Sequence, residues 1–113
     1  MKKLLSLILS ITFLTACNQG ANIVANAKAD FKVWGNCNMC KETIEGSLKV
    51  DGVSKAEWNT KSKQIEVSYD STKINLDAIQ KLIANVGYDN EKYNGSNEAY
   101  EKLHQCCKYD RKE

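Results

Sequence analysis

Three segments of the chain place hydrophobic residues on one face at a spacing of two, as half-buried strands do. The hydrophobic positions are Ala29, Phe31 and Val33 in the first segment, Ala56 and Trp58 in the second, and Ile65, Val67 and Tyr69 in the third. The polar run 59–63 separates the second segment from the third. This arrangement predicts a first strand and, later in the chain, a two-stranded hairpin.

Two other segments have the spacing of helices. Cys40, Ile44 and Leu48 follow one another at intervals of four, and Gly52 comes shortly after them. The second helix has a longer hydrophobic stripe, preceded by Asn75 as a candidate N-cap and followed by Gly87. The members of this stripe are Leu76, Ile79, Leu82, Ile83 and Val86.

Residues 88–93 have a weaker strand pattern and complete the order β-α-β-β-α-β over about residues 28–93. This order predicts an α+β, ferredoxin-like fold, in which two helices cover one face of a four-stranded antiparallel sheet. A short helical tail is expected to follow. The expected domain therefore spans residues 28–94, and the tail spans residues 95–113.

Two cysteines, Cys37 and Cys40, lie between the first strand and the first helix. At this spacing their thiols can bind one metal ion, and a helix N-terminus favours the charged thiolate form. Thiolates prefer Cu(I), Hg(II), Zn(II) or Cd(II) to hard cations. Because structural zinc requires four ligands, two thiolates fit the near-linear coordination of Cu(I) and Hg(II) better. The alternative is a disulfide, whose small loop would contribute little stability.

Four motifs in this region are similar to those of the heavy-metal-associated domain family, which includes copper chaperones and periplasmic mercury-binding proteins. They are Gly35-x-Cys37-x-x-Cys40, the run 50–53, the hairpin residues 65–70, and the run 86–88 at the end of the second helix. The resemblance implies that Cys37 and Cys40 bind one soft ion on an exposed loop and transfer it to a partner. The partner would be a metal-transporting ATPase or an efflux system, and paired loops would also allow a metal-bridged homodimer. The chain departs from the family in having Asn36 where many members have Met.

The N-terminus has the pattern of an export signal. Lys2 and Lys3 precede an apolar run that is too short to span a bilayer, and the sequence 14–17 resembles the lipobox of bacterial lipoproteins. We therefore expect a signal peptide at 1–16, a lipidated Cys17, and a tether that ends at residue 27. The protein would be a lipoprotein-type member of the family, anchored in the membrane on the extracytoplasmic side of the cell envelope. An ordinary secretory signal is the alternative.

The C-terminal tail contains Cys106, Cys107 and the single histidine, His104. On a helix begun by Ser96 or Asn97, Leu103 and Cys106 would lie on one side. These two residues would then dock the tail on the domain, because free cysteine is often buried. In a second interpretation, the two cysteines and His104 form another soft-metal site or complete the first one, which requires a break in the helix. The third interpretation is a disulfide between the neighbouring residues Cys106 and Cys107.

Composition excludes some other functions. Without Lys2 and Lys3 the chain has 14 basic and 14 acidic residues, and this balance gives no basic surface for nucleic acid. A thiol-disulfide oxidoreductase shares the CxxC spacing. A thioredoxin-like fold, however, needs a proline beside the thiols, and the chain has none. We therefore predict a Cu(I)-binding protein that passes the ion to a transporter or sequesters it, and not an enzyme. Hg(II) or Zn(II) binding by the same fold is the alternative. An envelope interaction protein that uses metal only structurally is the remaining alternative.

Overall fold

The computed structural model describes residues 25–113. The expected signal peptide, Cys17 and most of the tether lie outside these residues. In the described part, three strands form one antiparallel sheet in the order β1-β3-β2. They are β1 (Ala27–Lys32), β2 (Val53–Trp58) and β3 (Gln64–Tyr69). The register places Ile65 between Phe31 and Trp58, so that the hydrophobic positions predicted from the alternation share one face.

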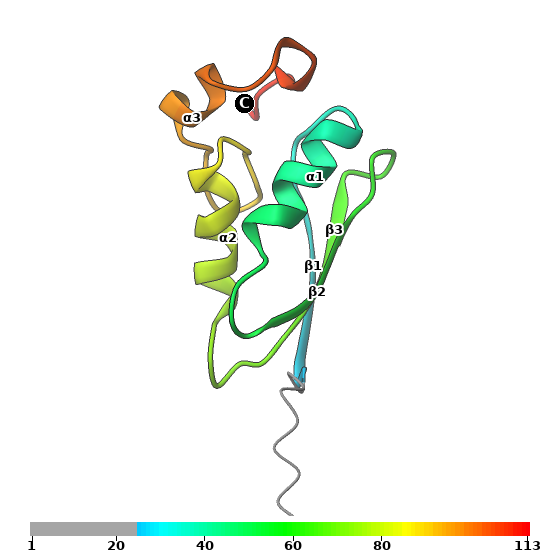
Figure 1. Cartoon of the computed structure of the whole chain (residues 1–113), viewed down its shortest axis with the longest axis vertical. Helices are drawn as coiled ribbons and strands as arrows, with labels where there is room; N and C mark the ends of the chain where they lie inside the picture. Colours follow the sequence, from blue (N-terminus) through cyan, green and yellow to red (C-terminus); the bar gives the residue numbers. More distant parts are fainter. Residues whose placement is uncertain (1–24) are drawn as a thin grey trace, which may run out of the picture.

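Helices α1 (Asn38–Ser47) and α2 (Leu76–Asn85) cover this face of the sheet (Figure 1). The predicted stripe of α1 is buried, since Cys40, Ile44 and Leu48 are at most 1% exposed. Helix α2 begins as predicted at Asn75, whose side chain accepts a hydrogen bond from the Ala78 N–H at 2.8 Å. Beyond its end, Gly87 has a φ of +99°, a conformation that favours glycine. Among residues 25–113, no helix has the length and hydrophobicity needed to cross a membrane.

The fold is the ferredoxin-like arrangement, but the fourth strand expected at residues 88–93 is reduced to one bridge. Asn90 pairs with Val33, and the chain then turns away from the sheet. The Asn90 side chain accepts hydrogen bonds from the N–H groups of Lys92 and Tyr93, both at 3.1 Å. This side-chain turn competes with strand pairing, and for this reason the sheet has three strands in the described part.

The tail folds across the end of the domain at which the β1–α1 loop lies (Figure 1). It contains the short helix α3 (Asn97–Glu101) and the 3-10 turn η1 (Gln105–Cys107). Ser96 caps α3, and its side chain accepts a hydrogen bond from the Ala99 N–H. The expectation that this helix would carry Leu103 and Cys106 is wrong, because the helix ends before them and His104 is extended, with φ −58° and ψ 150°. The break changes the directions of the two tail cysteines.

Candidate metal centre

The loop between β1 and α1 rests on a buried tryptophan. The Trp58 indole N–H donates to the Val33 carbonyl at 3.0 Å, and the ring lies directly beneath Gly35. A Cβ atom at Gly35 would be 2.9 Å from the Trp58 ring, which is closer than van der Waals contact allows. Glycine at this position therefore lets the loop lie flat on the core.

Cys37 and Cys40 lie at the N-terminus of α1, with different exposures. Cys37 is the N-cap residue and is partly exposed, whereas Cys40 belongs to the first turn and is fully buried. The backbone N–H groups of Cys40 and Met39 lower the pKa of the Cys37 thiol. The Asn36 N–H donates to the Cys40 sulfur at 3.4 Å. The N–H groups of Cys40 and Met39 favour the thiolate form of Cys37, because the helix terminus carries partial positive charge.

The tail brings a third thiol to this loop. The Sγ atoms of Cys37, Cys40 and Cys107 all lie within 4.8 Å of one another. Cys107 is only 2% exposed and belongs to the same hydrophobic core as Cys40. Burial, followed by interaction with Cys40, raises the pKa of Cys107 to about 12. We call these three residues the thiol cluster.

The other two candidate ligands of the tail lie outside the thiol cluster. Cys106 is exposed, and its thiol donates to the Met39 sulfur at 3.3 Å. Its carbonyl accepts hydrogen bonds from the Asn36 side-chain amide and from the Cys37 thiol, at 3.3 and 3.7 Å. His104 is exposed as well, and its backbone carbonyl accepts from the Cys107 N–H. The four described cysteines are free thiols, and the Sγ atoms of Cys106 and Cys107 are 3.9 Å apart.

Tyr88 also lies at this site, although no motif or spacing in the sequence predicts a role for its hydroxyl. It is fully buried, and its hydroxyl has no hydrogen-bond partner in the described part of the chain. Burial raises its pKa, and the neighbouring Cys40 and Cys107 thiols raise it further. The run Gly87-Tyr88 at the end of α2 is one of the motifs that resemble the family. Only the folded chain, however, brings the hydroxyl beside the thiols.

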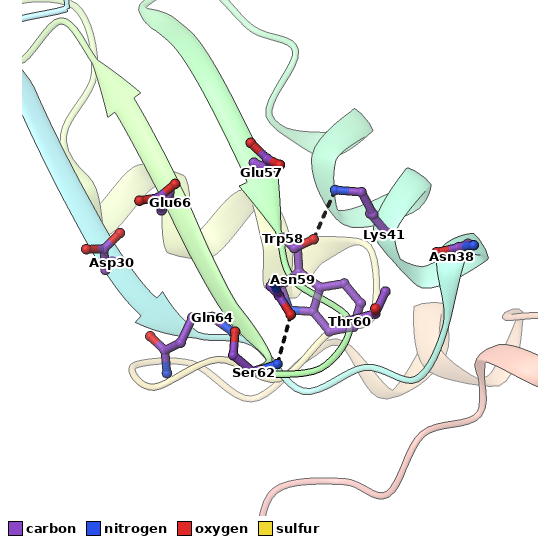
Figure 2. Close-up of a pocket in the computed structure, with 10 residues that line it drawn as sticks. All are labelled: Asp30, Asn38, Lys41, Glu57, Trp58, Asn59, Thr60, Ser62, Gln64 and Glu66. Carbon is purple, nitrogen blue, oxygen red and sulfur yellow. Dashed lines mark hydrogen bonds between the residues drawn. The ribbon is translucent and has the colours of Figure 1, made fainter.

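A separate pocket of about 590 Å³ lies on the outer face of the hairpin (Figure 2). Asp30, Glu66 and Glu57 cross the sheet there on adjacent strands, and Lys41 reaches in from α1. No sulfur atom lines this pocket, and hard carboxylate oxygens are poor ligands for soft ions. The thiol cluster is therefore the better candidate for soft-metal chemistry.

A ferredoxin-like domain with a CxxC loop after its first strand defines a class of small metal-binding modules. The heavy-metal-associated domain profile matches residues 36–89 of the chain. The copper chaperone CopZ of Staphylococcus aureus is 36% identical over 55 residues, which cover 48% of this chain and 81% of that protein. This chain belongs to the heavy-metal-associated domain family. Its relatives match it over metal-binding domains and not over catalytic ones.

Solved structures agree with this assignment. A structure described as CopZ metallochaperone has 32% identity and a TM-score of 0.55, covering 57% of this chain and 98% of that one. The N-terminal domain of a potential copper-translocating P-type ATPase from Bacillus subtilis, in its Cu(I)-loaded state, has 25% identity and a TM-score of 0.54. That match covers 62% of this chain and 90% of the ATPase domain. The profile match ends at residue 89, so Cys107 lies outside it.

Proposed function

We propose that the protein binds Cu(I) through Cys37 and Cys40 and passes it to another protein of the cell envelope. The observation that carries this proposal is the pair of thiols at the N-terminus of α1, on the loop supported by Trp58. Soft thiolates favour Cu(I), and the N–H groups around Cys37 stabilise the charged form that binds metal. The relatives named as copper chaperones support copper as the cargo.

Transfer would proceed by ligand exchange. A thiolate of the acceptor adds to the bound ion, and then one of the original sulfur–metal bonds breaks. Cys37 is the sulfur that an acceptor replaces first, because Cys40 is fully buried and Cys37 is partly exposed. The N-terminal domain of a metal-transporting ATPase is the acceptor of choice. Such a domain has the same fold, as the Bacillus subtilis example does.

The envelope location rests on the lipobox-like sequence at 14–17, and the topology bears only on how an anchored domain would be attached. Strand β1 runs from Ala27 toward the CxxC loop, so these two points lie at opposite ends of the sheet (Figure 1). A lipid on Cys17 would therefore attach the domain at the end of the sheet opposite its thiols. Globomycin, which inhibits lipoprotein signal cleavage, should make the unprocessed protein accumulate. Processing that globomycin leaves unchanged would exclude the lipoprotein assignment.

An anaerobic titration tests the cargo and the ligands. The reduced protein competes with a Cu(I) chelator of known affinity, and the double variant Cys37→Ser/Cys40→Ser should lose tight binding. Cys106→Ser is the matched control, because it removes an exposed thiol outside the thiol cluster. Tight binding that persists in the double variant would contradict the assignment. Tighter binding of Hg(II) or Zn(II) than of Cu(I) in the same competition would show that copper is not the preferred cargo.

A further inference from the structure

We propose that Cys107 is a third ligand of the metal site, so that the C-terminal tail closes over the bound ion and retains it. This inference rests on the proposed metal-binding function. The ion would be a soft, d10 cation held by three thiolates in trigonal geometry, and each coordinated thiol gives up its proton to solvent. Release to an acceptor would then require η1 to move away from α1.

The distances within the thiol cluster fit one ion. With metal–sulfur bonds of about 2.3 Å, sulfur atoms lie about 4.0 Å apart around a trigonal ion and about 4.6 Å apart across a linear one. All three Sγ atoms lie within 4.8 Å of one another in the metal-free chain. The three sulfur atoms are therefore already close to the separations that one bound ion requires.

A dedicated set of contacts holds the tail in this position. Asp89 is 1% exposed and accepts two hydrogen bonds from the Arg111 guanidinium, both at 2.8 Å. The N–H groups of Gly95 and Lys112 donate to the same carboxylate, at 2.6 and 2.8 Å. A buried carboxylate with several charge-assisted bonds fixes geometry strongly. Asp89 therefore anchors the segment that follows Cys107.

An aromatic cluster fixes the same segment from the other side. The Tyr109 ring stacks on Tyr88 with a centroid distance of 5.3 Å, and the Tyr100 ring packs perpendicular to Tyr109 with a centroid distance of 5.2 Å. The buried Tyr109 hydroxyl donates to the Gly87 carbonyl at 2.6 Å and accepts from the Asp89 N–H at 2.8 Å. Tyr109 lies two residues after Cys107. The cluster therefore sets where the Cys107 thiol can reach.

Two further observations distinguish Cys107 from the other tail residues. The sulfur of Cys106 faces Met39 at the exposed rim, and His104 is exposed outside the thiol cluster. The buried Tyr88 hydroxyl, beside Cys40 and Cys107, has no partner in the described chain. A buried donor without an acceptor is unfavourable, and a metal-bound thiolate at Cys40 or Cys107 would satisfy it.

X-ray absorption at the copper edge, on the reduced full-length protein in mild detergent loaded with one equivalent of Cu(I), counts the bound sulfur atoms. Cys106→Ser removes the neighbouring thiol that could substitute for Cys107. Copper in the Cys106→Ser variant should keep three bound sulfur atoms. In Cys106→Ser/Cys107→Ser it should have two, and this variant should bind Cu(I) at least about tenfold more weakly. Arg111→Gln leaves every thiol in place and should also lower the sulfur count by freeing the tail.

Three sulfurs in the double variant, or two in Cys106→Ser alone, would overturn the assignment of Cys107. Either result would leave the proposed function intact, because that function depends on the loss of binding in Cys37→Ser/Cys40→Ser. Circular dichroism of each variant establishes that the domain remains folded. Transfer of Cu(I) to an acceptor domain should be faster from Cys106→Ser/Cys107→Ser than from Cys106→Ser. An equal rate would show that the tail does not retain the ion.

Discussion

Cys37 and Cys40 share one turn at the start of α1, whereas Cys107 reaches the same point from the far end of the chain. The first pair is positioned by local geometry, since spacing and a helix N-terminus together place both sulfurs. The third thiol is positioned by long-range contacts, chiefly those of Asp89, Arg111 and Tyr109. A short sequence motif therefore positions the first two thiols, whereas the position of the third depends on how the C-terminal tail docks on the domain.

Removal of the Asp89 carboxylate is the largest expected disruption of the tail. Asp89→Ala leaves the Arg111 guanidinium without its buried partner and should reduce the free energy of unfolding by about 3–5 kcal/mol. Urea denaturation measures this change, and the alkylation rate of Cys107 should rise in the same variant. Glu98→Ala, which breaks an exposed ion pair with Lys102, should change stability by less than about 1 kcal/mol. Equal effects of the two substitutions would show that the tail is not anchored through Asp89.

Overpacking between the CxxC loop and Trp58 should perturb the site formed by Cys37 and Cys40. Gly35→Val pushes a side chain into the Trp58 ring and should reduce the free energy of unfolding by about 1–3 kcal/mol, with weaker Cu(I) binding. Gly46 is the matched control, because a Cβ atom there meets nothing within 4 Å. Gly46→Ala should stabilise α1 by about 0.5–1 kcal/mol and leave metal affinity unchanged. Unaltered stability and affinity in Gly35→Val would contradict the support given by Trp58.

Loss of the buried Tyr109 hydroxyl tests whether the aromatic cluster holds the tail in place. Tyr109→Phe keeps the ring stacking but leaves the Asp89 N–H and the Gly87 carbonyl without this partner. We expect a loss of about 1–2 kcal/mol in urea denaturation and faster alkylation of Cys107. Tyr93→Phe removes a hydrogen bond to Asp77 instead, on the α2 side. It should leave Cys107 as protected as in the wild type, and exposure of Cys107 in Tyr93→Phe would weaken the argument for a local anchor.

Acid should loosen the tail by protonating Asp89. Burial opposes ionisation of this carboxyl, but the Arg111 guanidinium and the N–H groups of Lys112 and Gly95 outweigh it and hold the pKa below the usual 3.8. The folded chain then binds fewer protons than the unfolded chain, so this stabilisation is complete above the unfolded pKa and is lost as pH falls through the lower folded value. The urea concentration at which the wild type is half unfolded should therefore decrease as the pH is lowered below about 4. Asp89→Asn should show a shallower decline, and identical pH profiles would exclude Asp89 as the source.

Much of the fold was predictable because its signals are local. The stripe of α1, the N-cap at Asn75 and the alternation in β3 each depend on residues a few positions apart, and all were confirmed. The prediction of a fourth strand was wrong, because hydrogen bonds to the side chain of Asn90 turn the chain back after a single bridge. The alternation of residues 88–93 contains no information about that competition. The leader and the lipid on Cys17 lie outside the described residues and remain predictions.

The sequence by itself determined the class of fold, the family and the CxxC loop as the candidate metal site. The reason is that periodicity and motif spacing act within a few residues, where the chain has little conformational choice. Only the tertiary structure brought the Cys107 thiol, and not that of Cys106, to Cys37 and Cys40 and placed the Tyr88 hydroxyl beside the thiols. Those positions depend on a break after α3, the Asp89–Arg111 ion pair and three packed tyrosines. The Asp89–Arg111 ion pair and the stacking of Tyr109 on Tyr88 join residues that are distant in the chain, and no local pattern encodes such contacts.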